Sequence, residues 1–256
     1  MSQTNVIARV EGFIGHLTFS NPARLNALPQ DGWLSVKPEL DNLLAENARV
    51  IIVSGEGDNF CAGADISEFD TVRKDAKTAR TYEASNVQAF DALRTCPVPT
   101  IAKIRGFCLG GGFGLAAACD LRVATQDARF AIPAAKLGLG YPIDAIADIV
   151  DAVGRQNAKH LLFTAETLSG TEMLDMGFLL EVLDESRIDA SCIQLSKMIS
   201  QLAPLTHRAT KAAIAALRTQ DWDNAKQQSD LTFSSHDYDE GRKAFREKRP
   251  PRFTAS

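Results

Sequence analysis

The sequence has few cysteines and histidines, and none stands at a metal-binding spacing. Five cysteines are scattered singly without a C-x-x-C pair, which argues against a disulfide framework or a zinc site. The four histidines show no ligand spacing either, so we expect no bound metal. Isolated thiols in odd number are typical of a reducing compartment, and we therefore expect a cytoplasmic protein.

Long apolar runs and clusters of positive charge are missing as well. Charged residues interrupt every apolar stretch well before the roughly 18 residues of a membrane-spanning helix, so we expect no membrane partner. The formal net charge is −4, and basic residues gather only near the C-terminus, which argues against a nucleic-acid partner. The first residues lack a basic segment followed by an apolar run, so we expect no secretory signal.

Hydrophobic residues, in contrast, are abundant. They make up 45% of the 256 residues, which is enough for one large core. Residues 50–55 form a continuous apolar run typical of a strand covered on both faces, and residues 75–95 have a helical period. Strands alternate with helices up to about residue 185, which predicts an α/β architecture. Helices alone are predicted afterwards, at 186–201, 204–218, 222–235 and 238–246. We therefore expect a core over residues 1–195 and a helical oligomerisation region over 196–256.

Two loops stand out because each follows a predicted buried strand: "GEGDNFCAGADISEF" and "GFCLGGGFG". Ligands of open α/β sheets bind beyond the carboxyl ends of strands, where these loops are expected. The glycines match neither a dinucleotide fingerprint nor a Walker loop, and no G-x-S-x-G occurs. Glycines at a helix start let a ligand oxygen approach free N–H groups, and two such groups from two loops would form an oxyanion hole. For the glycines alone, close packing of helix on strand is an equally good interpretation.

Taken together, "NFCAGADISEF" and "GFCLGGGFGLAAACDLRVAT" resemble the paired signature loops of the crotonase (enoyl-CoA hydratase/isomerase) family. "NPARLNAL", "ARFAIPAAKLGL" and "GRKAFREKRPPRF" resemble further segments of that family, so the resemblance extends over essentially the whole chain. It implies a spiral of ββα units with a helical C-terminal trimerisation region, assembled as a homotrimer or a dimer of trimers. It also implies acyl-coenzyme A thioesters as substrates, with coenzyme A as part of the substrate and no permanently bound cofactor.

The resemblance further implies which residues bind the substrate. The backbone N–H groups of Ala64 and Gly111 would hold the thioester oxygen. Coenzyme A would be contacted by Ala62, Asp65 and Ile66 along pantetheine and adenine, by Arg24 at the nucleotide phosphates, and by Phe245 and Lys248 of a neighbouring subunit. For the charges at positions 24 and 248, a solvated surface role is an equally good interpretation.

Both glutamates that hydratases of this family use are absent here. The corresponding positions are Gly114, inside the glycine-rich helix, and Ala134, just after Pro133. One general acid or base contributes roughly 10²–10⁴ in rate, so fast hydration requires a substitute group. An isomerase, or an atypical hydratase or lyase, of fatty-acid or carboxylic-acid catabolism is therefore the function that we expect.

Candidates for the substitute lie in "KLGLGYPIDAIADIV", around the start of a predicted helix. Tyr141 and Asp144 flank this start and are the candidate catalytic side chains, although a carboxylate in a first helical turn also complements the helix dipole. Asp148 is expected to face solvent, as is Lys136, and the thiols Cys61 and Cys108 are expected to pack. Two alternatives stay open: a thioester hydrolase that uses Asp144, and an acyl-CoA-binding protein without turnover.

Overall fold

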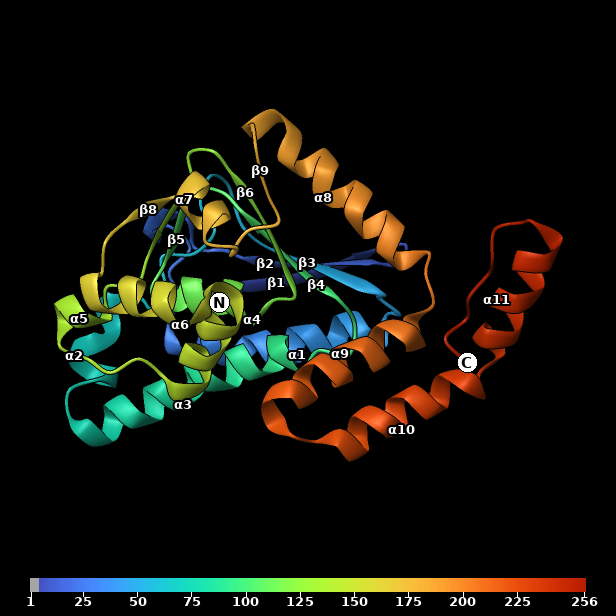
Figure 1. Cartoon of the computed structure of the whole chain (residues 1–256). Coiled ribbons are helices and arrows are strands. Elements are labelled where there is room, and N and C mark those ends of the chain that lie inside the picture. The colour runs from blue at the N-terminus through green and yellow to red at the C-terminus, as the bar shows by residue number, and fades with distance from the viewer. Residues whose placement is uncertain (1–4) are drawn as a thin grey trace.

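The computed structural model describes residues 5–256 and is organised around a six-stranded sheet (Figure 1). The strands follow the order β1-β2-β3-β4-β6-β9; β1 runs antiparallel to β2, and all other neighbours are parallel. Their bounds are β1 Val6–Glu11, β2 Ile14–Phe19, β3 Val50–Gly55, β4 Thr100–Ile104, β6 Leu121–Thr125 and β9 Glu181–Leu183. Gly12, with a φ of 64°, makes the tight turn between the first two strands.

A smaller three-stranded sheet lies beside the first and has the order β5-β7-β8. Its strands are β5 Phe107–Leu109, β7 Arg129–Ala131 and β8 Leu168–Ser169. Because β5 follows β4 directly and precedes the glycine-rich helix, this sheet fixes where that helix begins.

Helices cover both faces of the large sheet, as the alternating pattern of strands and helices predicts. Before β9 they are α1 Gln30–Ala45, α2 Phe69–Val72, α3 Ala76–Arg94, α4 Gly111–Ala118, α5 Ala134–Leu137, α6 Ile143–Thr164 and α7 Gly170–Asp175, with 3₁₀ turns at Pro22–Arg24 and Ile66–Glu68. In β3, Ile51 and Val53 join the main core with α1, α3 and α4, whereas Val50 and Ile52 pack under Ile188 of α8. The prediction of a strand buried on both faces is thus confirmed.

Four helices complete the chain, as predicted: α8 Glu185–Ser200, α9 Pro204–Thr219, α10 Trp222–Phe233 and α11 His236–Glu247. Helix α8 lies on the sheet, α10 packs along α9, and α11 stands away from the core beside the C-terminus (Figure 1). The boundary predicted at residue 195 falls inside α8, whose Ser196 is still buried, and the two-part division stays a prediction. Within residues 5–256, no helix combines the length and apolarity needed to cross a membrane.

Candidate active site

The two glycine-containing loops meet at the N-terminus of α4. The N–H of Cys61 donates to the Phe107 carbonyl, and the N–H of Leu109 donates back to the Cys61 carbonyl, each over 3.0 Å. Gly63, with a φ of +92°, approaches so closely that a Cβ on it would lie 2.9 Å from the nitrogen of Gly111. Only glycine combines this backbone angle with this approach, so the sequence of the first loop sets the contact.

This contact places the backbone of Ala64 beside that of Gly111, and both residues line one cavity. The N–H of Asp65 donates to the Leu28 carbonyl over 2.9 Å. Successive N–H groups of an extended segment point to opposite sides, so the N–H of Ala64 points away from Leu28. Among residues 5–256, no oxygen accepts a hydrogen bond from the N–H of Ala64 or of Gly111, whereas the N–H of Gly110 donates to Ala131 over 2.8 Å.

The cavity beyond these two N–H groups is small and mostly apolar. Its volume is about 140 Å³, close to the roughly 150 Å³ that accommodates a benzene ring. Its apolar wall comprises Trp33, Phe69, Phe90, Leu137 and Leu139. A group of about six non-hydrogen atoms therefore fits inside.

Tyr141, one of the two candidate catalytic side chains, lines one side of this cavity. Its hydroxyl donates to the Gly110 carbonyl over 2.7 Å. Burial is the main reason why the pKa of Tyr141 lies well above its usual range, so the phenol keeps its proton at neutral pH. This side chain can supply a proton, and it is no base.

The same hydroxyl occupies the place where a side chain at position 114 would begin. A Cβ on Gly114 would lie 2.8 Å from the Tyr141 oxygen and 2.7 Å from Cζ of Phe90. Ala134 lies on the cavity wall with only a methyl group. The tyrosine hydroxyl therefore fills the space that a side chain at position 114 would take, and position 134 offers no carboxylate to the cavity.

Asp144 is not brought to this cavity. It is exposed in the first turn of α6, and the residues that line the cavity wall do not include it. Lys136 is exposed as well. Tyr141 and Asp144, which sequence analysis put together, thus lie on different sides of the start of α6.

Asp148 corrects a prediction, because it is buried and does not face solvent. Its side chain is only 5% exposed and accepts hydrogen bonds from Nη2 and Nε of Arg94, over 2.7 and 2.8 Å, and from Nη1 of Arg218 over 2.7 Å. Arg94 ends α3 and Arg218 lies in the last turn of α9, so both partners come from distant segments. Two cations compensate the burial of one carboxylate.

The residues predicted to contact coenzyme A fall into two groups. Ala62 and Ile66 line the cavity, and the nearby Asp65 caps a 3₁₀ turn and accepts a hydrogen bond from Arg24 over 3.1 Å. Phe245 and Lys248 lie at the end of α11, where Phe245 is 87% exposed. Binding of coenzyme A by these residues stays a prediction.

Three polar residues of the cavity were missed by sequence analysis: Arg73, Glu83 and Asn86. Glu83 and Asn86 are three residues apart on α3 and so share one face of it. Asn86 falls among the buried residues of that helix, with Tyr82 before it and Ala89 after it. A polar residue inside an apolar stripe is the signal that could have identified it.

Two buried cysteines lie behind the loops. Burial raises the pKa of the Cys61 thiol to about 12 and that of Cys108 well above its usual value. Both are therefore protonated, unreactive packing residues, as expected.

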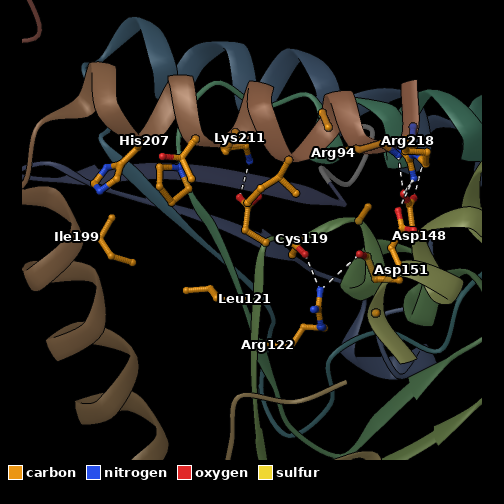
Figure 2. A pocket seen from close by; sticks show the side chains of 18 residues that line it. Arg94, Cys119, Leu121, Arg122, Asp148, Asp151, Ile199, His207, Lys211 and Arg218 are labelled. Carbon is orange, nitrogen blue, oxygen red and sulfur yellow. Dashed lines mark hydrogen bonds and ion pairs between the residues drawn. The ribbon is translucent and has the colours of Figure 1, made fainter. Parts of the chain in front are cut away.

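A second, larger cavity of about 520 Å³ opens between α9 and the core (Figure 2). In Figure 2, Arg94 and Arg218 converge on Asp148, and Arg122 points at backbone carbonyls, including that of Cys119 at 2.6 Å. Lys211 pairs with Asp120 at the same wall. Each aspartate, arginine and lysine of its wall thus has a partner within the chain.

The chain is similar to known proteins in both sequence and structure. A sequence model of the family described as enoyl-CoA hydratase/isomerase matches residues 9–256. A peroxisomal Delta(3,5)-Delta(2,4)-dienoyl-CoA isomerase of Arabidopsis thaliana is 30% identical, over 93% of this chain and 91% of the relative. The short-chain-enoyl-CoA hydratase of Clostridium acetobutylicum is 31% identical, over 97% of each protein. The crystal structure of an enoyl-CoA hydratase/carnithine racemase from Magnetospirillum magneticum superimposes with a TM-score of 0.93 at 32% identity, over 100% of this chain and 97% of that one.

Proposed function

Because the chain belongs to the enoyl-CoA hydratase/isomerase family and has its crotonase-type fold, we propose that it is an enzyme that binds an acyl-CoA thioester and stabilises its enolate. One observation carries this proposal: the N–H groups of Ala64 and Gly111 border one cavity and have no acceptor within the described part of the chain. A thioester oxygen between them would accept two hydrogen bonds, which strengthen as negative charge develops on that oxygen.

Enolate chemistry also requires a group that removes a proton from the acyl chain and a group that returns one. Glu83 is the carboxylate on the cavity wall, and no residue of the described chain pairs with it, so we assign it as the base. We assign Tyr141 as the proton donor because it lines the cavity and its phenol is protonated at neutral pH. Moving a proton from one carbon to another is an isomerisation, and an atypical hydration or a lyase reaction can proceed through the same enolate.

Two alternatives are outcomes of the same experiments. Hydrolysis would require Asp144, which is exposed and outside the cavity wall, to act on the thioester carbon. Binding without turnover would have less need of two unpaired N–H groups that border one cavity. The unpaired donors therefore favour an active enzyme.

We place the coenzyme A part of the substrate at the mouth of the cavity, along Ala62, Asp65 and Ile66, with the Arg24 guanidinium near the phosphates. Phe245 and Lys248 would contact the substrate of a neighbouring copy in a homotrimer or a dimer of trimers. Exposed apolar side chains on the last three helices support this assembly: Ile214, Leu217, Trp222, Leu231, Phe233 and Phe245. Sedimentation as a monomer at micromolar concentration would contradict it. The cytoplasm stays the predicted location, since all five cysteines are free and buried.

Exchange of the α-protons of butyryl-CoA with deuterium in D₂O tests the proposal without knowledge of the natural substrate. Replacing Ala64 with proline removes one donor and should slow exchange by about 10²–10³-fold, while circular dichroism shows a retained fold. Ala64→Ser keeps the N–H and is the matched control, expected to exchange at nearly the wild-type rate. Replacement of Gly111 is less clean, because a Cβ there would lie 2.7 Å from Cη2 of Trp33.

The result also separates the alternatives. Wild-type protein that binds butyryl-CoA but catalyses no exchange would favour the binding protein. Release of free coenzyme A would favour the hydrolase. Glu83→Gln should slow exchange by about 10²-fold or more if Glu83 is the base.

A further inference from the structure

We infer that the part of the cavity wall that Arg73 and Asn86 form recognises a carboxylate on the acyl group, so that the substrates are short CoA thioesters of carboxylated acids. This inference rests on the proposed function, since it names the class of acyl group that the same site takes. It is carried by two unpaired donors, on Arg73 and Asn86, that line one small cavity.

Arg73 is the first of these donors. Its guanidinium lies over the rings of Phe69 and Tyr82, with its carbon 4.9 and 4.7 Å from their centres. Its Nε is buried and has no acceptor, and no carboxylate of residues 5–256 lies within ion-pair distance of it. The residue as a whole is half-buried. A guanidinium that lies over two rings and whose Nε is shielded from water would gain from an anion nearby, and its planar fork suits a carboxylate.

Asn86 is the second donor. Its side chain is buried, with the residue only 8% exposed, and its Nδ2 has no partner in the described chain. Buried amide groups nearly always have a hydrogen-bond partner, so an unpaired one on a cavity wall indicates a polar ligand group. A carboxylate has two oxygens and can accept from Arg73 and Asn86 together.

Glu83 is the other charge on this wall and sets a condition on the inference. It lies beyond pairing distance of Arg73, so the guanidinium remains available to an anion of the ligand. The formal charges of Arg73 and Glu83 cancel. A ligand carboxylate would therefore be attracted only through its direct contact with Arg73. A variant without the Arg73 charge should instead prefer an uncharged acyl group, because Glu83 would repel the carboxylate.

The volume of the cavity limits the length of the acyl group. About 140 Å³ holds roughly six non-hydrogen atoms, as the benzene comparison indicates. A succinyl group has about six non-hydrogen atoms besides the thioester oxygen that the two N–H groups would hold, and it ends in a carboxylate. The 4-methylpentanoyl group has the same number and shape, with two methyl groups in place of the carboxylate oxygens, and is therefore the matched apolar probe.

The test is the dissociation constant of succinyl-CoA, 4-methylpentanoyl-CoA and coenzyme A, measured by calorimetry. The wild-type protein should bind succinyl-CoA at least about tenfold more tightly than 4-methylpentanoyl-CoA. Arg73→Leu should abolish or reverse this preference, through weaker binding of succinyl-CoA alone. Arg73→Lys should retain part of the preference for succinyl-CoA, and Asn86→Leu should reduce that preference less than Arg73→Leu does. Arg80→Ala removes an exposed arginine of α3 and is the control, expected to leave all three dissociation constants unchanged.

Other outcomes overturn the inference in distinguishable ways. If Arg73→Leu weakens all three ligands equally, Arg73 binds the coenzyme A phosphates and not the acyl group. If the wild-type protein binds both thioesters equally, or prefers the apolar one, the carboxylate inference fails while the proposed function stands. If neither thioester nor coenzyme A binds, the proposed function fails, and this inference fails with it.

Discussion

The two cavities of this protein lie at opposite ends of α4, a helix of eight residues and thus about 12 Å long. The cavity at its C-terminal end is the larger, yet its aspartates, arginines and lysines are all paired within the chain. The cavity at its N-terminal end is smaller, and its wall carries polar groups whose partners are absent from the described chain. Both cavities have charged residues on their walls, and only the N-terminal one leaves them without a protein partner in the described chain.

This difference between the two cavities indicates that volume alone does not identify a ligand site. A buried polar group costs free energy unless it is paired, and a fold leaves such groups unpaired where a ligand completes them. The direction of α4 adds to this, because its N-terminal N–H groups favour an oxyanion. We therefore expect substitutions at the C-terminal end to change stability, and substitutions at the N-terminal end to change turnover.

Replacing Asp148 with alanine should give the largest loss of stability. Two arginines would be left without their buried partner, which costs up to about 3–5 kcal/mol of unfolding free energy. The lower end is expected because the Arg218 side chain is 31% exposed. Urea unfolding measures this cost, and α-proton exchange by the folded fraction should be unchanged.

Asp151→Ala is the matched control for that experiment. Its carboxylate is exposed and pairs with Arg218 at 3.3 Å, so its removal should cost less than about 1 kcal/mol. Loss of turnover in a folded Asp148→Ala protein would contradict this comparison of the two cavities, since it would show that the cavity at the C-terminal end of α4 takes part in the chemistry.

Tyr141→Phe should have the opposite effect, with a large loss of turnover and a small loss of stability. The variant keeps the ring and removes the proton donor, so kcat should fall by about 10²-fold or more. The lost hydrogen bond to Gly110 accounts for about 1 kcal/mol of stability. Because burial raises the pKa of Tyr141, the folded protein retains this proton above pH 10, where a free tyrosine loses it. No alkaline loss of activity from this group is therefore expected below about pH 10.

Tyr82→Phe provides the comparison for Tyr141. Its hydroxyl is also buried, accepts from Nε1 of Trp33 over 3.0 Å and donates to the Leu28 carbonyl, yet Tyr82 does not line the cavity. It should lose stability and keep kcat. Equal kcat for the two variants would contradict the role assigned to Tyr141.

Adding a single carbon at Gly114 tests how tightly Phe90 and the Tyr141 hydroxyl enclose this position. Alanine there should destabilise the protein by about 1–3 kcal/mol, because its Cβ would press on Phe90 and on the Tyr141 hydroxyl. This cost exceeds the gain of up to about 1 kcal/mol that alanine brings to a helix. Gly241→Ala is the control: its nearest neighbour is Phe253 at 3.6 Å, so thermal melting should show a small gain.

How far the sequence predicts the site depends on how local each feature is. The loops around Gly63 and Gly111 could be predicted, because glycines after buried strands are visible in a short segment. Gly114 and Ala134, at the positions where the family resemblance implies glutamates, could also be identified from the sequence. Asp148 could not be placed, because its partners Arg94 and Arg218 are contributed by helices far along the chain in each direction.

The cavity residues Arg73 and Glu83 could not be predicted for a related reason. Arg73 follows a short helix and has no neighbour in sequence that marks it as unpaired. Glu83 could equally have been a solvated residue on α3. Only the packing of α3 against α4 and Tyr141 turns these side chains toward one cavity.

Asp144→Asn should have the smallest effect of the series. The carboxylate is exposed in the first turn of α6, where it complements the helix dipole, so its removal should cost about 0.3–1 kcal/mol of stability. Exchange of α-protons should stay within about twofold of the wild-type rate, since the carboxylate does not line the cavity. A fall in kcat of about 10²-fold with unchanged affinity would instead identify Asp144 as the proton carrier. That result would also show that the start of α6 turns inward when substrate binds, and it would move the base from Glu83 on α3 to the helix that begins beside Tyr141.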